Sequence, residues 1–372
     1  IYGPGIWTTV FANAQPIDAN TGFAAKSPQL AIDRSVTNQV YVTFVQNNGS
    51  ENHVYLSRYN GIDIRIWDVD VNNWTANFRN GDPIDTNQAR EADSPKIAID
   101  ASNRVYLGYR QNDGNYFNIY LNRYIDATNE LQAWKTDFPV RWTINLTNGD
   151  PIGISDATGD ALGPELTIDS EDRVYLAYAQ QKDGTDRIFM SRYSDPEVQI
   201  WSGTWRSDTF DQALPIDTGD TQADGHQVIA DSDDNIYVAF GQLMDSINRI
   251  HLTRWNGTAM EIWNSRVSQW TTTLSDGRPV DAATGQAAIA PEMAVDSSDR
   301  VYIAFHQLTD LATRVYLSRY EDTGSTSVPT VRIWDQTDQS WTTAFTDGDP
   351  IDAGTGGSAS FPQLAADPND NV

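Results

Sequence analysis

The chain has 372 residues, of which 39% are hydrophobic, and a net charge of −26 from 25 Lys and Arg against 51 Asp and Glu. This balance disfavours nucleic acid and anionic membrane surfaces as partners, because both need a basic face. The absence of cysteine excludes disulfides, thiolate zinc sites and cysteine nucleophiles. No apolar run has the length of a membrane helix, so we expect no membrane insertion.

One sequence unit recurs five times along the chain. It opens with an apolar run that ends in Asp, such as "SPKIAID", and a polar turn leads to a run such as "RVYLGYRQ". A third run ends in "RY" or "RW", and the unit closes with "IW", a second Trp and usually a turn like "GDPID". The five units cover about residues 28–94, 95–163, 164–225, 226–290 and 291–361.

These runs carry the signal of β-strands: they are short, rich in β-branched and aromatic residues, and bounded by turn residues. Four strands in a unit of about 65 residues predict an all-β propeller of four-stranded blades. Residues 6–18 match the end of a unit and residues 361–372 match its start. We therefore expect one propeller domain with six blades, the closing blade being split between residues 1–27 and 362–372.

The two terminal fragments leave the split blade without its third strand and without most of its second. Such a gap exposes unpaired backbone N–H and C=O groups, which can template a strand from another chain. Two expectations stay open. Strands from a longer polypeptide complete the blade, or a neighbouring chain donates a strand and links the domains into a fibre.

The stretch "PKIAIDASNRVYLGYRQNDGNYFNIYLNRY", followed by a Trp, resembles the bacterial BNR or Asp-box propeller repeats of sialidase-like proteins. The resemblance covers the second and third strands of every unit and implies a propeller fold. The family's Asp-box, Ser/Thr-x-Asp-x-Gly-x-x-Trp, would fall near "RYNGIDIRIW" or "RYIDATNELQAW". Its Gly is mostly lost there and the spacing to Trp varies, so the resemblance brings no enzymatic assignment with it.

Residues that recur in every unit are predicted to be structural. We expect the first Trp of each unit to be buried between blades, since large aromatic side chains dominate buried area. We expect each "RY" arginine to meet an acceptor in its own or the next blade, and each strand-end Asp to join an ion pair or cap a turn. The first Trp residues are Trp67, Trp134, Trp201, Trp263 and Trp334; the second are Trp7, Trp74, Trp142, Trp205, Trp270 and Trp341; the arginines are Arg58, Arg123, Arg192, Arg254 and Arg319; the aspartates are Asp33, Asp100, Asp169, Asp231, Asp296 and Asp367.

A ligand-binding rim is the main candidate site. Each second run ends in a Gln whose preceding residue differs from unit to unit, and an invariant amide beside a variable residue can line a pocket. The alternative is a Gln that holds a loop backbone. The candidate residues are Gln46, Gln111, Gln180, Gln242 and Gln307, with Arg110 and His306 as the two ionisable neighbours.

Calcium is the one cofactor that the sequence suggests. The turns after the last strand are rich in Asp, and hard cations bind several oxygens from a compact loop. Asp82 with Asp85 and Asp349 with Asp352 are the candidate ligands. Because Asp is also common in any tight turn, the alternative is that these residues only shape the loop.

The leading functional hypothesis is a non-catalytic protein, secreted or at a cell surface, that acts in binding or structural assembly with glycans, other surface proteins or itself. It rests on the acidic charge, the regular units and the lack of a carboxylate pair or nucleophile–base spacing at the variable positions. A lectin-like carbohydrate-binding propeller is the first alternative. A sialidase-like glycoside hydrolase is the second, and it needs two carboxylates or a Tyr nucleophile in a central cleft.

Overall fold

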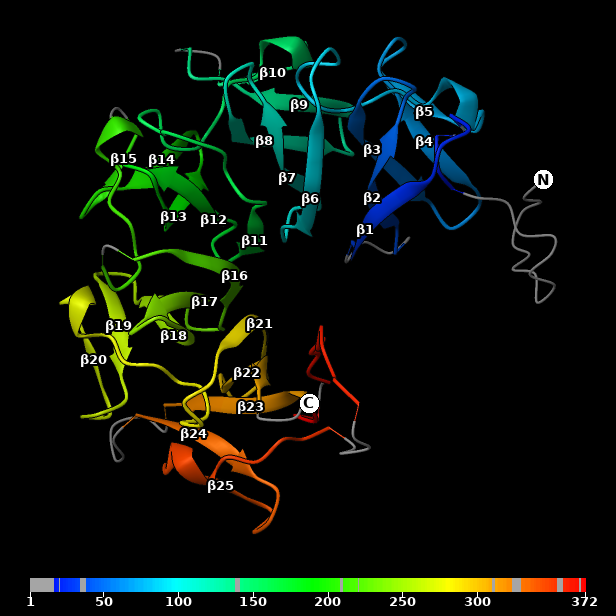
Figure 1. Cartoon of the computed structure of the whole chain (residues 1–372). Helices are drawn as coiled ribbons and strands as arrows, with labels where there is room; N and C mark the ends of the chain where they lie inside the picture. Colours follow the sequence, from blue (N-terminus) through cyan, green and yellow to red (C-terminus); the bar gives the residue numbers. More distant parts are fainter. Residues whose placement is uncertain are drawn as a thin grey trace. The chain divides into compact units, whose positions relative to one another are not determined.

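The computed structural model describes residues 17–19, 21–33, 38–137, 141–207, 210–219, 221–309, 312–322, 329–352, 357–367 and 369–372. Trp7 lies outside this range. The described chain is all-β and forms five antiparallel sheets, each built from one sequence unit (Figure 1). This succession of sheets is of propeller type. The helices are single turns, and none in the described part has the length and hydropathy of a membrane span.

Each sheet keeps its strands in chain order. The first contains β1 (Ala25–Ile32), β2 (Val40–Asn47), β3 (Asn52–Tyr59), β4 (Ile64–Asp68) and β5 (Asn73–Thr75). The second contains β6 (Ala92–Ile99), β7 (Arg104–Asn112), β8 (Phe117–Ile125), β9 (Glu130–Trp134) and β10 (Trp142–Thr143). The third contains β11 (Glu165–Ile168), β12 (Val174–Lys182), β13 (Thr185–Ser194), β14 (Glu197–Trp201) and β15 (Trp205–Arg206).

The remaining two sheets follow the same plan. The fourth contains β16 (Ala223–Ala230), β17 (Ile236–Met244), β18 (Ile247–Trp255), β19 (Met260–Asn264) and β20 (Gln269–Thr271). The fifth contains β21 (Ala288–Val295), β22 (Val301–Leu308), β23 (Thr313–Glu321), β24 (Thr330–Asp335) and β25 (Ser340–Thr342). A 3₁₀ turn follows each sheet: η2 (Phe78–Asn80), η3 (Leu146–Asn148), η4 (Phe210–Gln212), η5 (Leu274–Asp276) and η6 (Phe345–Asp347).

Each sheet has five strands, so the expectation of four was wrong. The two Trp residues of a unit lie on separate strands that pair as a hairpin, and Trp67 lies opposite Trp74 in the first sheet. The last strand is only two or three residues long. It was missed because so short a run has no periodicity of its own.

Contacts divide the chain into two compact units. The first contains Ile1–Ser155, Gly159–Ile168 and Tyr193–Val198, and the second contains Asp156–Thr158, Asp169–Arg192 and Gln199–Val372. The first two sheets therefore lie in the first unit, and the fourth and fifth sheets lie in the second. Each unit has aromatic clusters between neighbouring sheets as its core.

These clusters have one plan. In the first unit, Trp67 and Trp74 of the first sheet pack edge-on against Tyr124 of the second, with ring centroids 5.4 and 5.3 Å from it. In the second unit, Trp263 and Trp270 pack in the same way against Tyr320. The "RY" aromatic of one sheet thus fills a site made by the Trp pair of the preceding sheet. Edge-to-face packing of this kind adds to the energy of burial.

The predicted burial of the first Trp is confirmed for four of the five units. Trp67, Trp134, Trp201 and Trp263 are buried. Trp334 is only half-buried, so the expectation was wrong at this position. The four buried residues each have an aromatic ring from a following sheet against them, and no such ring reaches Trp334 among the described residues.

The two classes of Trp predict different stabilities for their Ala variants. Trp263→Ala should lower the free energy of unfolding by about 3–5 kcal/mol, because it opens a cavity in a closed cluster. Trp334→Ala should cost about half as much, because part of that side chain is already in water. Urea unfolding monitored by circular dichroism measures both. Equal losses would show that the fifth cluster is as well packed as the others.

Candidate functional site

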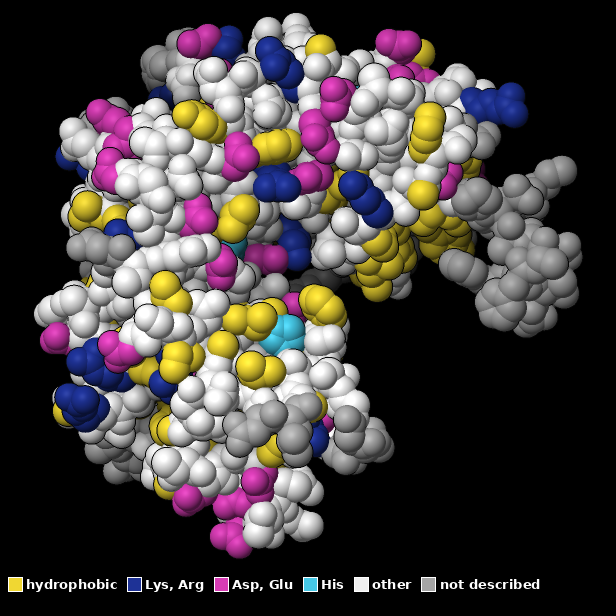
Figure 2. Space-filling view, in the orientation of Figure 1, with side chains coloured by type: hydrophobic (Ala, Val, Ile, Leu, Met, Phe, Trp, Pro, Cys, Tyr) yellow, Lys and Arg dark blue, Asp and Glu magenta, His cyan; other side chains and the backbone are white. Residues whose placement is uncertain are grey.

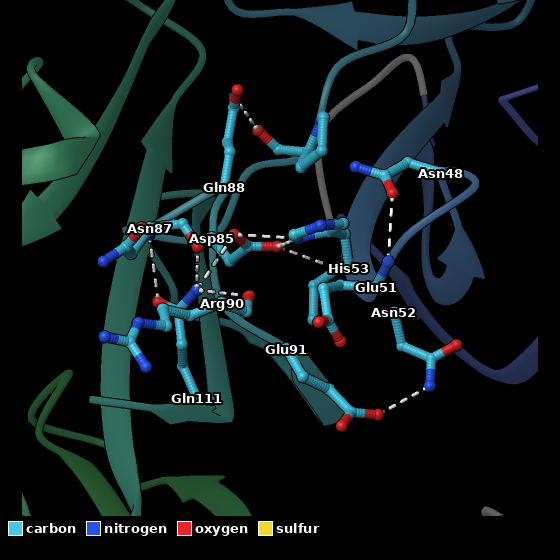
Figure 3. A network of polar contacts seen from close by, with 12 residues as sticks. Asn48, Glu51, Asn52, His53, Asp85, Asn87, Gln88, Arg90, Glu91 and Gln111 are labelled. Carbon is cyan, nitrogen blue, oxygen red and sulfur yellow. Dashed lines mark hydrogen bonds and ion pairs between the residues drawn. The ribbon is translucent and has the colours of Figure 1, made fainter. Parts of the chain in front are cut away.

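The Gln that ends each second strand holds a loop of the preceding unit. Gln111 at the end of β7 donates from Nε2 to the carbonyl of Asn87 at 2.8 Å and to Oδ1 of Asp85 at 3.1 Å. Its Oε1 accepts the Thr86 hydroxyl and the N–H of Asn87 (Figure 3). Both ends of the amide are therefore engaged by one loop.

The same arrangement recurs in the other sheets. Gln46 accepts the N–H of Ala19, Gln242 accepts the N–H of Thr218, and Gln307 donates to the carbonyl of Ala282. All five amides are buried, including that of Gln180. The five glutamines are therefore buried, and four of them bond to loops, as the loop-holding alternative requires.

A buried His and Asp lie next to this network. Nδ1 of His53 on β3 is 3.0 Å from Oδ2 of Asp85, and that oxygen also accepts the N–H of Val54 at 3.1 Å (Figure 3). An Asp that orients a His is a familiar catalytic element. Here both side chains are fully buried, and no hydrogen-bond partner reaches Nε2 of His53 among the described residues.

The repeat shows what this pair does. At the same place in the third, fourth and fifth sheets, an Arg on the third strand pairs with the Asp of the loop that follows the sheet. The pairs are Arg187–Asp217 at 2.6 Å, Arg249–Asp281 at 2.5 Å and Arg314–Asp352 at 2.9 Å. His53 with Asp85 is one member of a structural series that ties a strand to a loop.

The buried carboxyls of this series are held by their cations. Burial raises the pKa of the Asp281 carboxyl, and the Arg249 guanidinium opposes that rise. In the second sheet Asn118 and Gly153 stand at the two positions, so the pair is absent there. Sequence reasoning missed the series. The signal in the sequence was an Arg near the start of the third run in the units that have an Asp in the closing turn, as in Arg249 and Asp281.

Arg110 and His306 differ from each other in their surroundings. Arg110 makes two hydrogen bonds to the carboxylate of Asp93 and a third to the carbonyl of Ala161. His306 is buried, with the ring of Phe361 at 5.9 Å, and neither ring nitrogen has a hydrogen-bond partner within the described residues. Burial lowers the pKa of His306.

The candidate calcium ligands have other partners. Oδ2 of Asp82 accepts the N–H of Val69 and Oδ2 of Asp349 accepts that of Thr337, so both carboxylates cap the Trp hairpin of their own sheet. Asp85 and Asp352 belong to the structural series described above, with His53 and Arg314 as their partners. Over the described ranges, no three His, Asp or Glu side chains gather in a way that could hold a metal ion.

The recurrent arginines have structural partners, as predicted. Each guanidinium lies over the second Trp of its own sheet, as Arg58 does over Trp74 at 4.4 Å. Arg58 and Arg254 also donate to the Tyr hydroxyl of the next sheet, at 3.1 and 3.0 Å. Their other acceptors lie in the same or the next sheet; for Arg123, Arg192 and Arg319 these include Gln132, Gln199 and Glu321.

The strand-end aspartates cap turns, as predicted. Asp100 Oδ1 accepts the N–H of Arg104 and its Oδ2 pairs with Arg104 Nε, and Asp169 and Asp296 do the same with the Arg four residues on. Asp33, Asp231 and Asp367 accept the N–H of the residue that follows the turn. The ion-pair partner is therefore this Arg, and not the "RY" arginine.

The third sheet departs from the repeat at its outer hairpin. Three residues separate Trp201 from Trp205, whereas six or seven separate the two Trp residues of every other unit. In the first, second and fifth sheets an Asp caps the longer hairpin, as Asp82 and Asp349 do, while the fourth sheet has Arg278 at this position. The shortened hairpin leaves little for such an Asp to bind, and Leu214 stands at that position with 50% of its surface exposed.

Two cavities flank Leu214 and Pro215, and both lie within the second unit. One, of about 320 Å³, is lined by Lys182, Asp183, Thr185 and Arg187 from the end of β12 and the start of β13. The other, of about 330 Å³, is mostly apolar. Its lining residues besides Leu214 and Pro215 are Trp201, Gly203, Thr258, Ala259, Met260, Thr272 and Leu274. Each reaches the lower end of the volume range of ligand pockets.

Charge does not mark a separate site. On the face drawn in Figure 2, acidic and basic side chains are interspersed over the described surface. The exposed apolar residues include Leu214, Ile62 and Ile144, which lie far apart in the sequence. The departure of the third sheet from the repeat is one feature that distinguishes a place on the chain from its equivalents.

Comparison with known proteins establishes only the fold. No family model and no curated protein sequence matches the chain. A polysaccharide lyase structure described as a PL25 ulvan lyase is similar, with a TM-score of 0.50 and 11% identity over 80% of this chain and 67% of that one. An endo-arabinase from Bacteroides thetaiotaomicron has a TM-score of 0.38 and 12% identity, over 82% and 92% of the two chains.

One buried His predicts how stability depends on pH. His251 stacks on Phe240 with ring centroids 5.8 Å apart, and burial lowers its pKa to about 3 from the ordinary 6.5. The unfolded chain then binds more protons than the folded chain between these values, so stability falls as the pH falls through that window. From pH 7 to pH 5 this residue should cost about 2 kcal/mol.

His251→Phe is the matching variant, because Phe189 stands at the same place in the third sheet. It should lose about 2 kcal/mol less than the wild type on going from pH 7 to pH 5. Urea unfolding at the two pH values measures this difference. An identical pH dependence in both proteins would contradict a neutral buried imidazole.

Proposed function

We propose that the chain is a non-catalytic carbohydrate-binding propeller whose ligand lies across Leu214 and Pro215 of the third sheet. The observation that carries this proposal is the pair of cavities on the two sides of these residues, at the place where the sheet departs from its own repeat. The recurrent Gln, Arg and Asp side chains bond to other residues of the chain. A residue that departs from the repeat does not have this structural role, so it can contact a ligand.

The lining of the two cavities suits a saccharide. A sugar ring has apolar C–H faces and a polar edge of hydroxyls. The second cavity offers an apolar floor from Trp201, Pro215 and Met260 with the hydroxyls of Thr258 and Thr272 beside it. The first offers charged and hydroxyl side chains within the same stretch of surface. A few polar groups in an apolar pocket give orientation and specificity.

The non-catalytic part of the proposal rests on the state of the ionisable groups. The buried His53–Asp85 pair belongs to the structural series, and the recurrent arginines and aspartates bond to their own or neighbouring sheets. The similar structure is named as an ulvan lyase, which gives the same broad class of ligand, although its likeness to this chain concerns the fold alone.

Three further parts of the proposal extend the sequence hypothesis. The sheets close into a ring of six blades, the repeats belong with the BNR or Asp-box type, and the protein works outside the cell or at its surface. The terminal sequence fragments support the blade number. The acidic, cysteine-free composition is compatible with an extracellular location.

Leu214→Asp tests the site, because it restores the residue that three other sheets carry at this position. We expect it to weaken saccharide binding at least tenfold, about 1.4 kcal/mol, since a carboxylate replaces the apolar side chain between the two cavities. Isothermal titration of the full chain against a panel of neutral and uronate-containing oligosaccharides measures the effect. Ile62→Asp, at a residue 63% exposed in the first sheet, is the matched control and should bind as the wild type does.

The outcomes separate the alternatives. Binding that is equally strong in Leu214→Asp and wild type places the ligand elsewhere and overturns the site. Binding to no saccharide of the panel overturns the function. New reducing ends or unsaturated sugars released from a bound polysaccharide would show an enzyme and overturn the non-catalytic part.

A further inference from the structure

The fifth sheet contains the set of side chains that receives an aromatic ring in the other sheets. We call this set, which consists of a Tyr, two Trp residues and an Arg, the host site, and the ring that enters it from the next sheet the guest. The ring of Tyr302 lies 6.0 Å from that of Trp341, and Trp334 lies 5.4 Å from Trp341 at an angle of 73°. The guanidinium of Arg319 covers Trp341 at 4.3 Å. The fourth sheet has the same set in Tyr237, Trp263, Trp270 and Arg254. The host geometry is therefore complete in the fifth sheet.

In the other sheets, a guest ring completes this host. The guests are the "RY" or "RW" aromatics of the next unit: Tyr124, Tyr193, Trp255 and Tyr320. The hydroxyl of Tyr320 accepts the indole N–H of Trp270 at 3.1 Å and Arg254 at 3.0 Å. Tyr124 is held in the same way by Trp74 and Arg58. A Tyr guest thus has both packing and hydrogen-bond partners.

A carboxylate accompanies the Tyr guest. Tyr124, Tyr193 and Tyr320 are each followed two residues later by an Asp that their hydroxyl contacts. Asp126 also accepts from Arg58 of the preceding sheet at 2.8 Å. In this pair the guest therefore brings a carboxylate to an Arg of the host; Arg319 of the fifth sheet also has Glu321 of its own sheet as a partner, at 2.8 Å. Arg319 is the corresponding cation of the fifth sheet.

The described residues place no guest on the fifth sheet. Trp334 is half-buried, whereas its four equivalents are buried. The loop that follows the sheet shows the same difference. Ile351 is 40% exposed, whereas Ile84, Ile152, Ile216 and Val280 at the same position are 0% exposed. This face continues an interface that the chain builds repeatedly between its own sheets.

Within the described residues, a folded second copy has no hairpin to spare for this face. A guest hairpin must also hold the loop of its host through a Gln, and four glutamines of the described chain already hold loops. Gln46 of the first sheet accepts the N–H of Ala19, and Ser57 donates to the carbonyl of Ile17. Gln111, Gln242 and Gln307 hold loops of the preceding units. The guest must be an additional hairpin.

We propose that the face formed by Tyr302, Arg319, Trp334, Trp341 and Ile351 binds a partner β-hairpin of the repeat's own type. Its first strand ends in Gln, and its second ends in Arg-Tyr-x-Asp. The Tyr enters the Trp pair, the Asp faces Arg319, and the Gln holds the loop at Ile351. This interaction is independent of the saccharide site on the third sheet.

The test uses the full 372-residue chain and a synthetic peptide of residues 104–126, which is a hairpin of this type. We expect saturable one-to-one binding in native mass spectrometry, with a change in tryptophan fluorescence. The same peptide with Tyr124→Ala should bind at least tenfold more weakly, about 1.4 kcal/mol, because the guest ring is lost. Because the substitution is in the peptide, the 372-residue chain is the same in both measurements and its folding is not affected.

A second comparison locates the binding. Trp341→Ala in the chain should weaken the peptide to the same degree, while Trp205→Ala, at the equivalent place in the third sheet, should leave it unchanged. The proposal is overturned if the peptide does not bind at millimolar concentration, if the peptide with Tyr124→Ala binds equally well, or if Trp205→Ala weakens it as much. Self-association of the chain that the peptide inhibits would also overturn it, since a second copy would then occupy the face.

Discussion

The insertion of one aromatic ring into the Trp pair of the preceding sheet is the interaction on which the rest of the structure depends. Each sheet alone leaves a wide apolar face in water, and a single antiparallel sheet of this size cannot cover it. Tyr124 and Tyr320 each close such a face for the preceding sheet. Their hydroxyls also accept a hydrogen bond from an indole and from a guanidinium of the preceding sheet.

The loops between sheets are held from both sides by this arrangement. The Gln of the following sheet bonds to the loop backbone, as Gln111 does to Asn87, and in three sheets an Arg of the preceding sheet pairs with the loop Asp, as Arg249 does with Asp281. A buried pair of this kind is costly to break, because either partner alone would be an unpaired charge. The polar residues of the repeat are therefore occupied by the fold, which leaves little of them for chemistry.

Function is then expected where the repeat fails. The shortened hairpin at Trp201 and Trp205 removes the reason for a capping Asp, and Leu214 follows from that change. The fifth sheet fails in another way, because its host site is formed and its guest is not among the described residues. The first departure gives a place for a small ligand, and the second gives a place for a polypeptide. The two places differ in the type of ligand that they would bind, so each can be tested without the other.

The sequence by itself determined the strands, their order and the structural role of the recurrent Trp, Arg and Asp residues. It could do so because a period of about 65 residues and the alternation of side chains are properties of the chain alone. It could not reveal the fifth short strand, the pairing of Arg249 with Asp281 or the burial of the rim glutamines, since each depends on which loop folds back onto which strand. Only the tertiary structure decided that Leu214 lies between two cavities and that, among the described residues, no ring from a following sheet covers Trp334 as one covers its equivalents. Both are differences between repeats that look alike in sequence, and they arise from contacts between residues distant along the chain.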